Sequence, residues 1–197
     1  MPKWEIFKEA AERLESNGIA FVLCGGIAVW VYGRRRETTD VDFLVRECDV
    51  NSALELLKDN GFDIKRTDLR WLYQAFKDNA KVDLIFEAMG SVRLTPELEA
   101  HTQMKDLFGH TYKVISPEDL IIMKAHSISE ERPRDWYDAL SVLKGTDGQL
   151  DWDYLIERSR PRLRRMLGLL FFAQSEPSAS SYVPDWVIHR LLAYLPA

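Results

Sequence analysis

Cysteine and histidine are scarce in this sequence, with two cysteines and four histidines among 197 residues. Cys24 and Cys48 form no C-x-x-C motif, and the histidines are scattered along the chain. These absences exclude a disulfide framework and a zinc site built from Cys and His ligands. We expect both cysteines to be buried free thiols, as is usual for cysteine in a reducing compartment.

Long hydrophobic runs are also absent from the sequence. The longest apolar pieces, such as MLGLLFFA at residues 166–173, fall short of the roughly 18 residues that a membrane-spanning helix needs. The N-terminal segment has the pattern of an amphipathic helix and lacks the apolar core of a signal peptide. We therefore expect a soluble, cytoplasmic protein that has no membrane partner.

Neither a P-loop motif nor an excess of positive charge is present. The sequence contains no G-x-x-x-x-G-K-[ST], and its formal net charge is −5 at pH 7. A general nucleic-acid coat protein is therefore disfavoured. Two local basic clusters, at residues 33–37 and 157–165, have the charge to meet phosphates, although solvated turns and helix faces often carry such clusters.

The composition is that of an ordinary folded protein, with 46% apolar and 29% charged residues. Helical and strand patterns alternate up to about residue 115, and beyond it the periodicity is helical only. Helices are predicted at 3–16, 26–33 and 49–60, and strands at 19–25, 40–46, 62–66, 71–78 and 81–87, with a further hairpin at 105–116. Tight turns are expected at Asn79-Ala80 and Gly109-His110. The chain is thus expected to divide into an α/β part, residues 1–115, and a helical part, residues 116–197.

Two acids in the strand DVDFLVR carry the first chemical signal. Side chains alternate along a strand, so Asp40 and Asp42 point to the same face. Asp83, in the later strand KVDLIFE, reaches the same site if the two strands are neighbours. Carboxylate oxygens are preferred ligands of hard divalent cations, and a pair of such cations clamps a reacting phosphate. The alternative is a set of surface acids that do not converge.

A glycine pair precedes these acids. Gly25-Gly26 closes one predicted strand and opens a helix, which allows a sharp turn and exposes backbone amides. A helix N-terminus favours negative charge, so this turn has the properties of a phosphate seat. By itself, the pair is more often an ordinary strand-to-helix turn. In combination with the acids, it suggests a site that holds a triphosphate together with metal ions.

At these residues the chain resembles the nucleotidyltransferase superfamily of the DNA polymerase β type. The superfamily signature is a Gly-Gly or Gly-Ser pair, a spacer, and then Asp-x-Asp, here Gly25-Gly26 and Asp40-Val41-Asp42. Asp83 matches the third family carboxylate. The resemblance implies an α+β fold, with a nucleotidyltransferase-like mixed β-sheet flanked by helices and followed by an all-helical C-terminal part. It also implies that residues 1–115 form the catalytic core.

The helical half resembles bacterial stand-alone nucleotidyltransferases, including the abortive-infection toxin group. In that group a helix lysine is followed by an Arg-Asp-x-x-Asp run, which Lys124 and Asp135 match, with Asp138 one turn further on. The resemblance implies that Lys124 faces the triphosphate and that Asp135 orients it or a neighbouring base. The alternatives are a solvated helix lysine and an exposed acid near a helix start.

The resemblance implies transfer of an NMP from an NTP, ATP among them, to an acceptor hydroxyl, with release of pyrophosphate. Asp40, Asp42 and Asp83 would bind two Mg²⁺ ions, and Asp83 would also take the acceptor's proton. Four further positions, Gly25, Gly26, Arg36 and Thr39, would hold the nucleotide's phosphates. The acceptor stays open between a small molecule, an RNA end and a protein, the last with a cognate antitoxin as partner. The alternative is a non-catalytic nucleotide-binding or toxin–antitoxin partner protein that keeps the fold.

Overall fold

The computed structural model describes residues 2–195 and divides into two compact units. The first consists of the residues up to Ala28, together with Arg36–Ala88 and Val92–Ser116. The second consists of Val29–Arg35, Met89–Ser91 and the residues from Pro117 onward. This division rests on packing alone, so the assignment of residues 1–115 as a catalytic core stays a prediction. No helix in the described part of the chain is long and apolar enough to cross a membrane.

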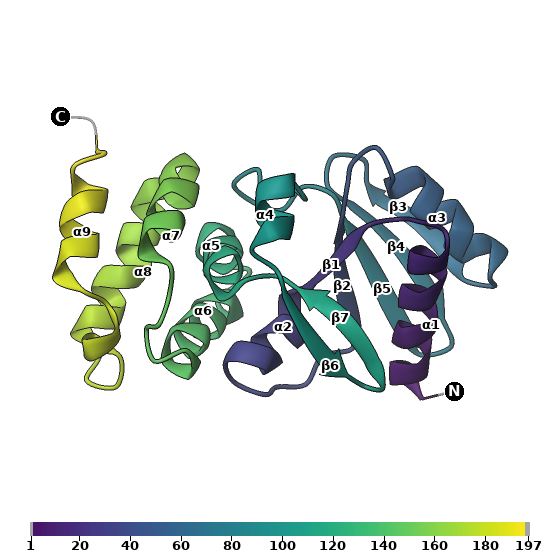
Figure 1. Cartoon of the computed structure of the whole chain (residues 1–197), viewed down its shortest axis with the longest axis horizontal. Coiled ribbons are helices and arrows are strands. Elements are labelled where there is room, and N and C mark those ends of the chain that lie inside the picture. Colours follow the sequence, from purple (N-terminus) through teal and green to yellow (C-terminus); the bar gives the residue numbers. More distant parts are fainter. Residues whose placement is uncertain (1, 196–197) are drawn as a thin grey trace. The chain divides into compact units, whose positions relative to one another are not determined.

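The first unit is built on a seven-stranded mixed sheet with the strand order β3-β4-β5-β2-β1-β7-β6 (Figure 1). The pairs β2/β5 and β1/β7 are parallel, and the other neighbours are antiparallel. The strands are β1 Phe21–Cys24, β2 Asp40–Val45, β3 Asp63–Asp68, β4 Leu72–Lys77, β5 Ala80–Ile85, β6 Gln103–Leu107 and β7 His110–Val114. The expected mixed sheet is therefore confirmed.

Helices α1 (Lys3–Ser16) and α3 (Val50–Asp59) contact each other and pack on the sheet at β4 and β5 (Figure 1). The apolar residues Ile6, Phe7, Ala10, Ala11 and Leu14 of α1 are buried, in agreement with the helical spacing of apolar residues in the sequence. Helix α2 (Gly25–Tyr32) begins directly at the end of β1, and α4 (Pro96–Ala100) lies between β5 and β6 in the chain. This arrangement positions the β1–α2 turn beside the first residues of β2.

The second unit is helical, as expected. Helix α5 (Pro117–Ser127) is its centre, because every residue from Pro117 to His126 is buried and it contacts three other helices of the unit. The remaining elements are α6 Arg134–Gly145, α7 Trp152–Ser159, α8 Leu163–Ser175 and α9 Asp185–Leu192, with short 3-10 helices at Arg160–Arg162 and Ser180–Tyr182.

Three local expectations are wrong. Lys77 pairs with Ala80 and Leu107 with His110, so each hairpin turns one residue earlier than predicted. At the second turn, Phe108 and Gly109 both have positive φ, as the favoured two-residue hairpin turn requires, which puts the glycine second rather than first. The expectation of two buried thiols also fails for Cys48, which is exposed on the turn before α3, whereas Cys24 is buried.

Candidate active site

The three predicted acids lie on one face of the sheet in the first unit. Strands β2 and β5 are parallel neighbours, with Asp40 opposite Lys81 and Asp42 opposite Asp83. Side chains in register on adjacent strands point to the same side, and the period of two keeps all four on that side. The strand pairing that the sequence could only assume therefore exists.

Lys81 joins two of these carboxylates. Its Nζ atom lies 2.9 Å from Asp40 Oδ2 and 3.0 Å from Asp83 Oδ2. The other carboxylate oxygens are also engaged, since Thr38 Oγ1 donates to Asp40 Oδ1 at 2.7 Å and Gln74 Nε2 donates to Asp83 Oδ1 at 2.8 Å. Both carboxylates are thus held in fixed orientations, each with its Oδ2 turned toward the same cation.

The surroundings shift the pKa values of Asp40 and Asp83 in opposite directions. Burial acts to raise the pKa of Asp40, but hydrogen bonds from Lys81 and Thr38 outweigh it and hold this pKa below its ordinary value. Burial raises the pKa of Asp83 above its ordinary value, against the opposing hydrogen bonds from Gln74 and Lys81. Asp83 is therefore the more basic of the two carboxylates.

The glycine turn is shaped around Asp42. Gly25 has φ +61°, and a Cβ at this position would lie 2.0 Å from Asp42 Oδ2. The backbone amide of Gly26 donates to the same oxygen at 3.3 Å. The side of Gly26 is covered by Thr38 and Arg36, whose nearest atoms would lie 3.0 Å and 3.2 Å from an added Cβ. Only glycine lets the start of α2 approach the carboxylate this closely.

The donor set of this face suits a hard cation. The Oδ2 atoms of Asp40 and Asp83 already share a positive charge, the ammonium of Lys81, which stands where a cation is stabilised by both. Across residues 2–195, no group of three or more Asp, Glu, His or Cys side chains is arranged as a set of metal ligands. The assignment of Asp40, Asp42 and Asp83 as metal ligands therefore stays a prediction.

Two predicted phosphate-binding residues follow α2 in the chain. The guanidinium of Arg36 lies against Gly26 and donates to the carbonyl of Glu37 at 3.1 Å. Thr39 is exposed, whereas its neighbour Thr38 is buried and bonds to Asp40. Contacts of Arg36 and Thr39 with phosphate stay predictions.

Lys124 and Asp135 meet in the second unit. Lys124 Nζ lies 2.7 Å from Asp135 Oδ1 and 3.2 Å from Asp138 Oδ2, and all three residues are buried. Arg132 pairs with Asp135 at 3.0 Å, and Arg34 pairs with Asp138 at 3.0 Å. The alternatives of a solvated lysine and an exposed acid are therefore wrong. A role of Lys124 and Asp135 toward the triphosphate stays a prediction.

Sequence reasoning missed Lys81, Thr38 and Gln74 as members of the site. The signal for Lys81 was its position two residues before Asp83, which places both on one strand face. Thr38 and Gln74 gave no such signal, because their contacts depend on the pairing of β4 and β5 and on the path of the chain into β2.

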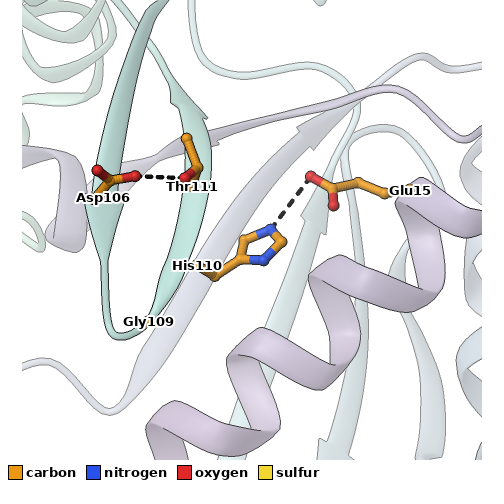
Figure 2. A pocket seen from close by; sticks show the side chains of 5 residues that line it. All are labelled: Glu15, Asp106, Gly109, His110 and Thr111. Carbon is orange, nitrogen blue, oxygen red and sulfur yellow. Dashed lines mark hydrogen bonds and ion pairs between the residues drawn. The ribbon is translucent and has the colours of Figure 1, made fainter.

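A separate cavity of about 540 Å³ lies elsewhere on the first unit (Figure 2). It is lined by residues of α1 and of the β6–β7 hairpin, namely Glu15, Asp106, Gly109, His110 and Thr111. Figure 2 shows the ring of His110 directed at Glu15. The distance from His110 Nε2 to Glu15 Oε1 is 3.3 Å. None of the acids described above lines this cavity, so it is not part of the candidate site.

Three solved structures share the fold of the chain. An antigenic nucleotidyltransferase-like protein from Paracoccidioides brasiliensis gives a TM-score of 0.61 at 15% identity, over 94% of this chain and 96% of that one. ANT(2")-Ia in complex with adenylyl-2"-tobramycin gives 0.55 at 13% identity, over 83% and 99%. The lincosamide antibiotic adenylyltransferase LnuA, lincomycin-bound, gives 0.50 at 15% identity, over 72% and 98%. These likenesses confirm the nucleotidyltransferase-like fold.

At the level of sequence, no curated protein matches the chain. The model of one protein family, described as "Nucleotidyl transferase of unknown function (DUF2204)", matches residues 3–161. This range contains the glycine turn, the three acids and the Lys124–Asp135 pair. It also covers most of the chain, and the resemblance to nucleotidyltransferases is thereby confirmed. The chain belongs to this family of nucleotidyltransferase enzymes.

Proposed function

We propose that the protein transfers an NMP from an NTP to the hydroxyl of a small-molecule acceptor, with Mg²⁺ bound by Asp40, Asp42 and Asp83. The observation that carries the proposal is the convergence of Asp40 and Asp83 on one cation, with Asp42 held at the first turn of α2. A non-catalytic nucleotide-binding protein has no need of three acids on one sheet face, and the family is one of enzymes.

Each residue has a defined task in this reaction. The acceptor oxygen forms a bond to the α-phosphorus, and the bond between that phosphorus and the pyrophosphate oxygen breaks. Bound Mg²⁺ would stabilise negative charge on the attacking and leaving oxygens. Asp83 would take the hydroxyl proton on a carboxylate oxygen.

The phosphate-binding residues come from the segment that surrounds the start of α2. The amides of Gly25 and Gly26 open this helix, whose N-terminal end attracts anions. The guanidinium of Arg36 lies beside Gly26 and supplies positive charge at the same place. Thr39 is exposed on the same segment and offers a hydroxyl. These groups orient the β- and γ-phosphates and hold the pyrophosphate as it leaves.

A small-molecule acceptor is favoured over RNA by the charge distribution. The positive charge of the basic cluster at residues 157–165 is partly neutralised by internal ion pairs, because Arg158 bonds to the buried Asp119 and Arg160 bonds to Glu157. Arg162 and Arg165 bond to backbone carbonyls of the same unit. The net charge of −5 also disfavours a polyanion as the acceptor. The names of LnuA and of the ANT(2")-Ia complex give small antibiotics as partners of those proteins. A protein acceptor and a cognate antitoxin have no support of this kind.

The test is incubation of the purified protein with each α-labelled NTP and Mg²⁺ in the presence of separate acceptor pools. The pools are lincosamides, aminoglycosides, total RNA and cell protein, and a sample with chelator serves as the control. We expect label on a small molecule and none in the chelator sample. Label confined to RNA or protein overturns the acceptor class, and no label in any pool overturns the proposed reaction.

A further inference from the structure

We infer that Lys81 is a built-in substitute for a divalent cation, which holds Asp40 and Asp83 in place in the metal-free protein and must leave them when metal binds. Lys81 is then a positioning residue that weakens metal binding in the absence of nucleotide. The inference rests on the proposed function, because it takes Asp40 and Asp83 as metal ligands.

The contacts of Lys81 are those of a shared cation. Its Nζ atom is nearly equidistant from Asp40 Oδ2 and Asp83 Oδ2, at 2.9 Å and 3.0 Å. The remaining oxygens of the two carboxylates accept hydrogen bonds from Thr38 and Gln74, which leave the Oδ2 atoms to face the ammonium. The orientation of Gln74 is itself fixed, since its amide oxygen accepts a hydrogen bond from Thr67 at 2.7 Å. The strand register places Lys81 directly opposite Asp40.

Burial makes this neutralisation necessary. The Asp83 side chain is 9% exposed, and a carboxylate taken out of water without a partner is costly. Lys81 supplies the missing positive charge, and the two carboxylates in turn raise its pKa against the opposing effect of burial. A metal-free protein with the same acids and no lysine would carry unbalanced negative charge at this point.

A divalent cation and the ammonium compete for the same oxygens. Metal bound at Asp40 and Asp83 would repel the ammonium and replace its hydrogen bonds, so each binding event must release Lys81. The side chain of Lys81 is 29% exposed, which permits this release because its charged end can move into solvent. The site with Lys81 therefore binds metal more weakly than the same site without the lysine, because the two ion pairs must be broken. A bound triphosphate compensates for this loss by adding phosphate oxygens as metal ligands.

The test is a Mn²⁺ titration of the full chain without nucleotide, read by the electron paramagnetic resonance of free Mn²⁺. Lys81→Met is expected to bind Mn²⁺ at least about tenfold more tightly than the wild type, a change of about 1.4 kcal/mol. Lys81→Gln serves as the second variant if Lys81→Met is unfolded in chelator. Lys77→Met is the matched control, because Lys77 has a similar exposure, pairs with Glu9 at 2.7 Å and touches none of the three acids.

The outcomes distinguish this inference from the function on which it rests. A gain in affinity for Lys81→Met but not for Lys77→Met, lost again when Asp40→Asn is added, supports the inference. Affinity of both Lys81 variants equal to or below that of the wild type overturns it, while Mn²⁺ binding by the wild type with an NTP still supports the proposed function. Absence of Mn²⁺ binding by every protein, with and without NTP, overturns both.

Discussion

Asp42 lies directly opposite Asp83 in the register between the parallel strands β2 and β5. The two residues come from distant parts of the chain, and only this pairing puts both carboxylates on one face of the sheet. A slip of one residue would turn Asp83 to the opposite face. The packing that fixes the register, with Phe43 and Leu84 fully buried on the other face, therefore also fixes the site.

Asp42→Asn is expected to reduce nucleotidyl transfer by roughly 10²–10³-fold, because an amide cannot replace a carboxylate as a ligand that stabilises charge in the transition state. The side chains have the same size, so the fold should persist. Labelled-nucleotide incorporation and circular dichroism measure the two effects. Asp63→Asn, at an exposed acid of β3, is the control and should transfer at the wild-type rate. Equal incorporation by Asp42→Asn and Asp63→Asn would remove Asp42 from the mechanism.

Gly25→Ala is expected to impair both stability and transfer. The left-handed backbone at φ +61° costs a residue with a Cβ roughly 1–2 kcal/mol. The added methyl group would also lie 2.0 Å from Asp42 Oδ2, so the Asp42 carboxylate would have to move. Thermal denaturation gives the first effect and steady-state kinetics the second. We expect a lower melting temperature together with a fall in kcat.

Gly61→Ala is the matched control for this substitution. Gly61 has φ +82°, and nothing lies within 4 Å of the position where its Cβ would be. It should therefore lose a similar amount of stability and keep its transfer activity. If both variants lose activity in proportion to their stability, the close approach of Gly25 to Asp42 has no part in the chemistry.

The sequence predicts the local elements well where periodicity is strong. Helix α1 follows from the spacing of Phe7, Ala11 and Leu14, and strand β2 from the alternation of acids with branched and aromatic residues. The hairpin turns are displaced by one residue because a two-residue turn takes positive φ at its first position, here Asp78 and Phe108. The phenylalanine in particular is a residue that composition alone does not place there.

The candidate site could be predicted only in part, for a physical reason. The acids and glycines are recognisable because each belongs to a short motif. The contacts that organise them, above all those of Lys81 and Gln74, depend on which strands are neighbours, and non-local pairing is not encoded in the pattern of any single segment. The buried state of Lys124 was likewise hidden, because it depends on the packing of α5 against α6.

Lys124→Met is expected to destabilise the protein by about 1–3 kcal/mol, because the buried carboxylates of Asp135 and Asp138 lose the cation that they share. The loss is limited because Arg132 and Arg34 still pair with these two carboxylates. Chemical denaturation measures the free energy of unfolding. Lys113→Met removes an exposed partner of Glu99 and should cost no more than about 1 kcal/mol. Wild-type stability in Lys124→Met, combined with loss of transfer, would contradict the structural role and favour the contact with the triphosphate.

The buried histidine of α5 is expected to make the protein less stable as the pH is lowered. His126 is 1% exposed and packs directly on Gly90, and burial together with the positive charge of Arg162 lowers its pKa from 6.5 to about 4. Between these values the unfolded chain binds a proton that the native chain excludes, so the free energy of unfolding decreases as pH falls from about 6.5 to 4, by at most about 1.4 kcal/mol per pH unit from this group. Urea denaturation across this range should give a shallower pH dependence for His126→Leu than for the wild type. Leucine at position 126 cannot titrate. Equal slopes of the unfolding free energy against pH would therefore show that groups other than His126 cause the pH dependence.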